Sequence, residues 1–397
     1  MQIDCKHCGG RHGRHQPFCP VLQDLRSRSN VKRTAKQDFF GASPNIFIGR
    51  FGYPHINVGL LSTEHYSHHD DPLHWSGNNF QIPQIVDLRT ELINSGFSAN
   101  VKTFKDRFIE MSREISMAEK PVDVEVHLSR KPHLNINYVR DAAPHGPKVR
   151  LEEARITENP KIPTKVEKVT SDTDLKASEA LRYLSKKGTD EHYLTKLISL
   201  GNLGVGPNRK LVPTRWAITA VDDTLGKQII IHIKDLQSYD YAACFGGYLG
   251  NYYLILFFPE IWSYELFETA LGNRPMTGTD HEFYDGRKTY ASETAGGYYA
   301  SRLAVLQHLK SLKRQASVLV LRFITNEYYA PLGVWVVREA TRKALSSRSI
   351  NFGSKELMLQ YAKALVRKKF GYDTGNLLKV SKLLQHQRNQ SKLSSFI

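Results

Sequence analysis

Apolar residues in this chain follow two spacings, which together predict a mixture of helices and strands. The runs Tyr252–Pro259 and Ser317–Phe323 are apolar without polar alternation, a pattern that favours strands covered on both faces of a sheet. Further strands are predicted within Ser43–Ser62, at Val122–Leu128 and at Leu211–Val221. Apolar residues at helical spacing predict helices over Pro83–Ser95, Val101–Met117, Asp174–Lys186, Asp190–Ser199, Glu260–Leu271, Glu293–Gln315 and Pro331–Leu345. The predicted class is therefore α+β or mixed α/β, a sheet-containing globular body with several helices.

The length of the chain and the positions of its prolines predict more than one domain. A single core stops growing near ~250 to 300 residues, so a chain of 397 residues suits two or three domains. Four prolines lie between Arg140 and Lys165, which makes this stretch the best candidate for an internal boundary. The predicted division is a zinc-finger module with a basic connector at 1–40, an N-terminal α/β domain at 41–150, a C-terminal α/β domain at 151–371, and a flexible basic tail at 372–397.

Positive charge is concentrated at the two ends of the chain. The sequence holds 55 Lys and Arg residues against 39 Asp and Glu, a formal net charge of +16. The ends, residues 1–40 and 355–397, together supply 12 of these 16 charges. A balanced middle with basic ends suits a folded body whose terminal segments contact a polyanion, most often a nucleic acid; solubility alone is the alternative. No apolar run approaches the ~20 residues that cross a bilayer, so we expect a cytoplasmic, nucleoid-associated protein without a membrane partner.

Three of the four cysteines lie in the first 19 residues, in the string CKHCGGRHGRHQPFC. Cys5 and Cys8 form a Cys-x2-Cys pair, and His15 with Cys19 supplies a second pair that completes the tetrahedral set favoured by zinc. Two other histidines of the string, at positions 7 and 12, compete for the fourth position, and spacing favours His15. The loop between the pairs is short, so we expect a closed structural Zn²⁺ site that folds a segment too short to build a core. A tail without metal is the alternative.

The last residues, QRNQSKLSSFI, place apolar side chains on one side of a short helical turn. Leu393, Phe396 and Ile397 would form a three-pronged apolar plug, with Gln390 at its edge able to hydrogen-bond. An exposed Phe-Ile pair at a free terminus is unfavourable without a partner. The pattern resembles the peptide by which replication and repair proteins dock on the sliding clamp PCNA, with one departure at Ile397, where an aromatic residue is usual. A tail folded back on its own domain is the alternative.

Several long strings in the body of the chain resemble one known family. They are ENPKIP at Glu158–Pro163, LVPTRWAITAVDD at Leu211–Asp223, YLGN at Tyr248–Asn251, GRKTYASETAGGYYASRLAVLQHL at Gly286–Leu309 and PLGVWVVREA at Pro331–Ala340. With the cysteine-rich start and the terminal peptide, they resemble the archaeal Nre family of DNA repair proteins. The resemblance implies a role in the repair of DNA damage, a zinc finger as in the family's NreA form, and association with PCNA. It implies no defined reaction.

Five polar residues of the body are candidates for catalysis because their types suit phosphodiester chemistry. Arg215, Asp222 and Asp223 are placed at the end of the predicted strand Leu211–Val221, where carboxylates can hold a divalent metal and an arginine can clamp a phosphate. Adjacent carboxylates point to opposite faces of a regular strand, so a shared metal requires a turn; Asp223 capping the next helix is the alternative. Arg287 and Tyr290 precede a predicted helix whose first amide groups could receive a phosphate, with the tyrosine as a stacking face.

A histidine-rich loop carries the ligand types for a second divalent metal. The string EHYSHHDDPLHW contains His65, His68, His69, Asp70, Asp71 and His74. His69 and Asp71 are also near enough along the chain for acid–base chemistry. A plain surface loop is the alternative.

These patterns support two functional hypotheses. The first is a DNA damage repair factor that is recruited through PCNA and binds DNA by its basic ends and a central cleft. The second is an enzyme, a metal-dependent hydrolase or nuclease-like protein that acts on nucleic acid or on a nucleotide-derived lesion. The second hypothesis requires Arg215, Asp222, Arg287 and Tyr290 to converge on one cleft.

Overall fold

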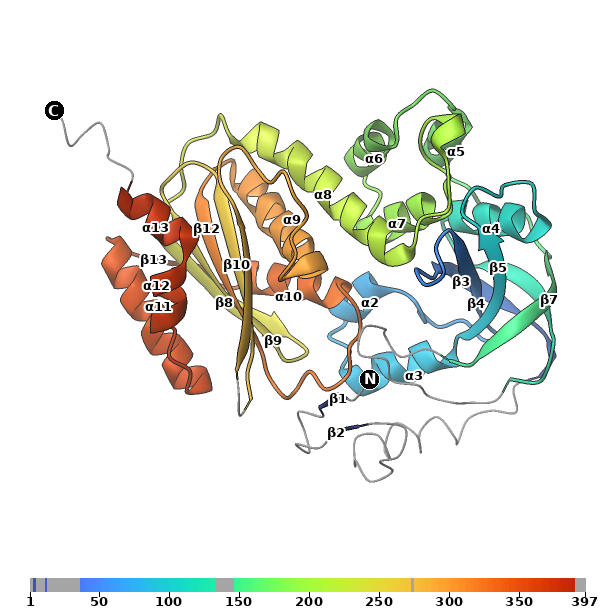
Figure 1. Ribbon diagram of the computed structural model, residues 1–397, viewed down its shortest axis with the longest axis horizontal. Coiled ribbons are helices and arrows are strands. Elements are labelled where there is room, and N and C mark those ends of the chain that lie inside the picture. Colours follow the sequence, from blue (N-terminus) through green and yellow to red (C-terminus); the bar gives the residue numbers. More distant parts are fainter. Residues whose placement is uncertain (1–2, 5–10, 13–35, 133–145, 273–274, 390–397) are drawn as a thin grey trace. The chain divides into compact units, whose positions relative to one another are not determined.

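The computed structural model describes residues 3–4, 11–12, 36–132, 146–272 and 275–389 (Figure 1). The chain divides into two compact units, residues 1–225 with 329–333 and residues 226–328 with 334–397, which we call the barrel unit and the sheet unit. The predicted mixture of helices and strands is confirmed. The division between the units falls inside the helix Thr214–Ile233, and the predicted boundary stretch, residues 140–165, includes a strand at Lys148–Ile156. No described helix is both long and apolar enough to span a bilayer.

The barrel unit is built on a closed five-stranded barrel. Its strands are β3 (Asp38–Ile48), β4 (His55–Thr63), β5 (Ile93–Asn100), β6 (Val122–Leu128) and β7 (Lys148–Ile156). They are hydrogen-bonded in the order β3-β4-β5-β7-β6, and β3 also pairs with β6 to close the barrel. Only the β5–β7 pair is parallel. A register shift in β3 lets its first half pair with β6 and its second half with β4.

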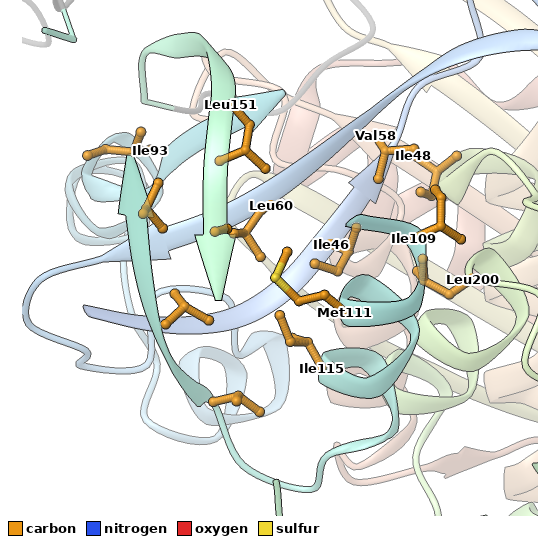
Figure 2. Close-up of a cluster of buried hydrophobic side chains, with 14 of the residues drawn as sticks. Ile46, Ile48, Val58, Leu60, Ile93, Ile109, Met111, Ile115, Leu151 and Leu200 are labelled. Carbon is orange, nitrogen blue, oxygen red and sulfur yellow. The ribbon is translucent and has the colours of Figure 1, made fainter. Parts of the chain in front are cut away.

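Alternating apolar side chains fill the barrel, and helix α4 (Arg107–Met117) packs against this core. Ile46, Val58 and Leu60 are fully buried, and α4 adds Ile109 and Ile115 (Figure 2). The two predicted strands around the turn at residues 52–54 and the predicted strand at residues 122–128 are therefore confirmed.

The remaining elements of the first 225 residues come before, between or after the barrel strands along the chain. They are the short pair β1 (Ile3–Asp4) and β2 (Arg11–His12), and helices α2 (Pro72–Gly77), α3 (Ile82–Glu91), α5 (Thr164–Ser171), α6 (Ala177–Lys186), α7 (Glu191–Ser199) and η1 (Gly206–Asn208). Helix α8 (Thr214–Ile233) follows, and the division between the units lies within it. The predicted acidic start of the helix at residue 190 is confirmed, because the Asp190 carboxylate accepts a hydrogen bond from the backbone amide of Tyr193 at 2.9 Å.

The strand predicted at Leu211–Val221 is wrong, because α8 occupies most of this stretch. The helix follows Pro213, whose carbonyl oxygen accepts from the backbone amides of Trp216 and Ala217, at 2.8 and 3.0 Å. Its residues include many β-branched types and its apolar positions are not confined to one stripe, so the pattern lacks the one-sided helical spacing and favours a strand.

The sheet unit has a six-stranded sheet with helices on both faces (Figure 1). Its strands, in the order β11-β10-β12-β9-β8-β13, are β8 (Ala242–Tyr248), β9 (Asn251–Phe258), β10 (Ser263–Ala270), β11 (Met276–Glu282), β12 (Ser317–Ile324) and β13 (Ile350–Asn351). Its helices are α9 (Ala295–Leu312), α10 (Trp335–Leu345), α11 (Lys355–Phe370), α12 (Gly375–Val380) and α13 (Lys382–Asn389). Helices α11 to α13 pack on one face, and α9 and α10 lie on the other.

The apolar strand predicted at residues 317–323 is confirmed as β12, which lies inside the sheet and is buried on both faces. The helix predicted at Glu260–Leu271 is wrong, because this stretch forms β10. Its eight residues pair in parallel with β12, and both of its faces are largely covered. Tertiary pairing thus overrides the helix-favouring glutamates and leucines of this segment.

Candidate functional site

The histidine-rich loop between β4 and α2 is organised by Asp71, the N-cap of α2. One oxygen of the Asp71 carboxylate accepts from the backbone amide of His74 at 3.0 Å, and the other lies 2.9 Å from Nδ1 of His68. His68 has a backbone φ of 53°, a left-handed conformation that non-glycine residues rarely adopt. This conformation and the cap bring side chains three and six residues apart to one place.

His68, Asp71 and His74 form a candidate metal site. One ligand atom from each of the three lies within 4.8 Å of the others, which within the described part of the chain is the one such group of three. The two imidazole rings stack with centroids 3.6 Å apart and planes 5° from parallel. Because a zinc ion needs each nitrogen lone pair aimed at it from ~2.0 to 2.1 Å, one ring would have to turn for both to coordinate. The residue types fit zinc or a similar divalent ion.

His69 has a different role from its neighbours in the loop. Its Nδ1 accepts a hydrogen bond from the backbone amide of Ser67 at 2.8 Å, so Nε2 carries the proton and donates to Glu91 Oε2 at 2.9 Å. The side chain is buried. The predicted acid–base pair of His69 and Asp71 is therefore replaced by two other pairs, His69 with Glu91 and His68 with Asp71.

Asp70 is a buried carboxylate held by three polar side chains. The Asn45 amide donates to its Oδ2 at 2.5 Å, Arg89 forms an ion pair with its Oδ1, and His192 Nε2 lies 3.4 Å from Oδ2. Burial by itself would raise the pKa of Asp70, but Arg89, His192 and Asn45 hold it well below the usual range of a carboxyl group. Asp70 is therefore ionised and can fix the orientation of the His192 ring.

A cavity of about 170 Å³ borders Asp70. Its ionisable lining residues are Tyr66, Asp70, Asp71, Glu119, Asp190, His192, Tyr193 and Lys196. Four carboxyl side chains against one lysine and one histidine suit a cationic ligand or a metal ion better than a bare phosphate. Because Asp71 lines the cavity and also belongs to the candidate metal site, an ion bound there would lie beside it.

Lys196 and His192 are one turn apart on α7 and both face this cavity. Lys196 Nζ lies 3.5 Å from the carbonyl oxygen of Pro44 and 4.9 Å from the centroid of the Tyr193 ring. Burial lowers the pKa of Lys196, although nearby carboxylates oppose the shift. Burial, with Asp71 and Asp70 nearby, raises the pKa of Tyr66 to about 12. An amine with a lowered pKa beside a carboxylate-oriented histidine is an arrangement suited to proton transfer.

The candidate residues Arg215, Asp222 and Asp223 lie on α8 in the barrel unit and not at the end of a strand. Arg215 is exposed, Asp222 is fully buried and Asp223 is partly buried. Successive residues of a helix are turned by ~100°, so the two carboxylates do not face one point. The predicted start of a new helix at Asp223 is also wrong, because this residue lies in the middle of α8.

Arg287 and Tyr290 lie between β11 and α9 in the sheet unit. Arg287 is paired with Asp280 at 3.0 Å and donates to the carbonyl oxygen of His281 at 2.8 Å. Tyr290 stacks on Tyr299 with ring centroids 5.4 Å apart. Arg287 is thus tied into the structure of its own loop.

The Asp280 carboxylate fills the place predicted for a phosphate. It accepts from the backbone amides of Ser292, Glu293 and Thr294, at 3.3, 3.0 and 2.7 Å. These are the amides just before α9, so the positive end of this helix is already neutralised by the protein's own carboxylate.

The zinc ligands predicted at Cys5, Cys8, His15 and Cys19 lie outside the described residues. So do the clamp-binding residues predicted at Gln390, Leu393, Phe396 and Ile397. The sequence singles out Asp70 as part of the histidine-rich loop but not its partners, because Asn45, Arg89 and His192 share no motif with it. A second local signal is the spacing of His192 and Lys196 at i and i+4 on a predicted helix.

Comparison with known proteins gives a consistent result over most of the chain. The family model described as "Archaeal Nre, N-terminal" matches residues 14–273, and "Archaeal Nre, C-terminal" matches residues 282–396. A protein named DNA repair protein NreA, from Haloferax volcanii, is 38% identical over 82% of this chain and 82% of its own length. DNA repair protein NreB from Archaeoglobus fulgidus is 36% identical over 98% of this chain and 99% of its own. DNA repair protein NreA from the same organism is 36% identical over 93% and 95%. No solved structure matches the chain.

Proposed function

Because this chain belongs to the archaeal Nre family, we propose that it is a DNA repair factor recruited to its site of action by docking on the sliding clamp PCNA. Relatives that cover most of its length carry the name DNA repair protein, which supports the repair role. The observation that carries the recruitment is the C-terminal string QRNQSKLSSFI, whose glutamine and three apolar residues have the spacing of a clamp-docking peptide.

Helix α13, which directly precedes the proposed peptide in the sequence, is held by hydrogen bonds at its N-terminus. Helix α13 ends at Asn389, directly before Gln390. At its other end the buried Glu265 carboxylate accepts from Ser381 Oγ at 2.5 Å and from the backbone amides of Lys382 and Leu383, at 2.9 and 3.0 Å. This carboxylate caps α13 in the manner that helix N-termini favour. The proposed peptide would therefore extend from an anchored helix.

Contacts with DNA are proposed for the basic ends of the chain. On α11 the side chains of Lys363, Arg367, Lys368 and Lys369 are exposed. Cations in the last turn of a helix also suit its dipole, so their place on α11 alone does not select DNA. The proposed zinc module, with Cys5, Cys8, His15 and Cys19 around a structural Zn²⁺, would add a second basic contact at the other end.

Calorimetry with PCNA from the same organism tests the recruitment. We expect saturable binding of the full chain, and a loss of affinity of about 100-fold in Phe396→Ala/Ile397→Ala, because two buried apolar side chains of the plug are removed. Ser394→Ala, within the peptide but outside its pattern, should bind within about twofold of the natural chain. Unchanged binding of the double variant would overturn the proposed docking.

A cellular experiment tests the repair role separately. Cells that lack the gene and carry the natural chain should survive treatment with DNA-damaging agents better than cells that carry Phe396→Ala/Ile397→Ala. Equal survival of cells with no copy of the gene would contradict the repair role itself.

A second candidate function is a metal-dependent hydrolase that acts on nucleic acid or on a nucleotide-derived lesion. The observation that favours it is the His68, Asp71 and His74 cluster beside a cavity that contains Lys196 and His192. A bound divalent ion would supply Lewis-acid activation of a phosphate or a water. The side chains of this chain would hold the ion and move a proton at Nε2 of His192 or Nζ of Lys196.

Metal analysis tests this second function. The full chain should bind one more equivalent of zinc than His68→Ala/His74→Ala, and His65→Ala, an exposed histidine of the same loop, should bind as the natural chain does. Hydrolysis of DNA or nucleotides, if the hypothesis holds, should disappear in Lys196→Ala and persist in His65→Ala. Equal zinc content in all variants would remove the basis of the hypothesis.

A further inference from the structure

The barrel has the strand order and helix position of the OB-fold, a barrel that often binds single-stranded nucleic acids. Numbered from β3, its order is 1-2-3-5-4 with strand 1 closing on strand 4, and the third and fifth strands are parallel. The helix between the third and fourth strands, α4, packs on the core. The insertion of α2 and α3 falls between the second and third strands. In OB-folds, the loop between the first two strands flanks the surface that binds oligonucleotides.

In this chain that loop is the turn between β3 and β4, and it exposes large aromatic side chains to solvent. Phe51 is 75% exposed and Tyr53 is 44% exposed. Gly52 between them has φ of 82°, so the tight turn requires a residue without a side chain. The Arg50 guanidinium lies over the Phe51 ring, 5.0 Å from its centroid. Exposed aromatic rings gathered in one place mark a binding surface more often than chance.

The start of α8 adds a third exposed ring to the same surface. Trp216 is 47% exposed, and its ring centroid lies 5.4 Å from that of Tyr53. The Thr214 hydroxyl accepts from the backbone amide of Ile48 at 2.9 Å, which fixes α8 beside the end of β3. Arg215, which lies between Thr214 and Trp216 in the sequence, is also exposed. We call Arg50, Phe51, Tyr53, Arg215 and Trp216 the aromatic turn.

The segments that meet at the aromatic turn carry positive charge only. The backbone amide of Val101 donates to the carbonyl of Pro54 at 3.0 Å, and the amide of Leu211 donates to the carbonyl of Val101 at 2.8 Å. Three segments, 47–57, 100–103 and 209–217, are thereby held together. They contain no Asp or Glu. Their three arginines are Arg50 and Arg209, which are partly exposed, and Arg215, which is exposed; Lys102 and Lys210 are exposed as well. A phosphate backbone is the polyanion that such a surface complements.

We propose that the aromatic turn binds single-stranded DNA, with bases stacked on Phe51 and on the Tyr53–Trp216 pair and phosphates on the surrounding arginines and lysines. This inference rests on the proposed repair function, which makes DNA the relevant nucleic acid. Stacking on flat side chains requires bases that are free of a duplex, and it is tolerant of sequence because every base has a π-face. The arginine over Phe51 adds a cation next to the stacking ring.

Fluorescence anisotropy with a labelled oligo(dT) of about 16 nucleotides, a length that covers the site of one OB-fold, tests the proposal on the full chain. Phe51→Ala and Trp216→Ala should each weaken binding about tenfold, because each removes one stacking ring. Phe40→Ala is the matched control: it removes a phenylalanine of similar exposure, 57%, from β3 in the same barrel, and should bind within about twofold. Arg215→Gln should lower the slope of log affinity against log salt by about 0.7.

Further measurements separate this proposal from its alternatives. Trp216→Phe should keep most of the affinity but lose most of the tryptophan quenching on binding, since Trp216 is a strongly exposed indole. Thermal melts should show that all five variants remain folded. Equal affinities of the natural chain, Phe51→Ala and Trp216→Ala would overturn the proposal, as would tighter binding of duplex DNA or of RNA of the same length. If the natural chain binds PCNA but no oligonucleotide, the recruitment stands and this inference alone fails.

Discussion

Both units contain buried charged side chains with polar partners, but the surroundings of these side chains differ. In the sheet unit, Arg302 and Glu282 pair at 2.6 Å with side chains that are 1% and 0% exposed. Glu265 and Asp280 are likewise buried, and each closes the start of a helix. In the barrel unit the buried Asp70 also has partners, but it borders a cavity.

This difference separates structural charges from candidates for function. A charged group whose hydrogen bonds are all satisfied inside a sealed core has little capacity left for a ligand. Arg287, singled out for phosphate binding, is partly exposed, but Asp280 and backbone carbonyl oxygens already occupy its guanidinium group. The groups around the cavity and the aromatic turn instead reach space that a ligand can enter.

The largest loss of stability is expected when a buried ion pair of the sheet unit is broken. Arg302→Met should reduce the free energy of unfolding by about 4 kcal/mol, because it leaves the Glu282 carboxylate buried without its cation. Trp262 Nε1 still donates to that carboxylate at 3.1 Å, which does not replace a charge. Urea denaturation of the full chain measures the change.

Two further variants make this test specific. Arg302→Met/Glu282→Gln should be more stable than Arg302→Met alone, because no buried charge is left behind. Glu125→Gln breaks the exposed Arg155–Glu125 pair, with side chains 69% and 49% exposed, and should change the stability by less than about 0.5 kcal/mol. Equal losses in the single and double variants would show that the pair is not the origin of the effect.

The sequence predicts elements well where local pattern and tertiary environment agree. The apolar run at residues 317–323 is a central strand, and the glycine turn at residues 52–54 joins two strands. Prediction from the sequence fails where the local pattern and the tertiary environment disagree. Helix α8 is rich in β-branched residues yet forms a helix, and β10 contains Glu265 and Glu268, which look solvated in the sequence. Their partners, Ser381 and Arg322, are far along the chain, so no local pattern reveals that both carboxylates are satisfied inside the fold.

The candidate sites divide in the same way. The metal cluster lies within seven residues, so the loop EHYSHHDDPLHW predicts its ligand types, although not which histidines converge. The cavity cannot be predicted, because Asp70 meets Asn45, Arg89 and His192 only through the packing of β3, α3 and α7. The aromatic turn has a sequence signal, Arg-Phe-Gly-Tyr-Pro between two strands, but Trp216 joins it only because a hydrogen bond fixes α8 there.

A smaller loss of stability is expected when the same kind of change is made in the barrel unit. Arg89→Met removes the cation that is paired with Asp70, and we expect a loss of about 2 kcal/mol. Asp70 keeps its hydrogen bond from Asn45, Arg89 is itself 18% exposed, and water can enter the adjoining cavity to solvate the carboxylate. Urea denaturation beside Arg302→Met gives the comparison. A loss as large as that of Arg302→Met would mean that Asp70 is as sealed as Glu282, and the contrast between the units would fail.

The smallest effect is expected for an exposed pair that joins two strands of the barrel. His127 on β6 is hydrogen-bonded to Asp38, the residue directly opposite it on β3. This bond and the negative charge of Asp38 raise the pKa of His127 above its ordinary value. A histidine whose pKa is higher in the folded state stabilises the fold below its unfolded pKa, and the stabilisation is lost as the pH rises through the folded pKa. The stability advantage of the natural chain over Asp38→Asn should therefore shrink from pH 5 to pH 9.

NMR titration measures this pair directly. The His127 signal, assigned by its absence in His127→Gln, should titrate at a higher pH in the natural chain than in Asp38→Asn, where the charged acceptor is gone. The pair is solvent-exposed, so salt should reduce the difference by screening. Identical midpoints in the two proteins would show that water competes fully with Asp38 for His127. The comparison between the barrel unit and the sheet unit would then rest on their buried charged side chains alone.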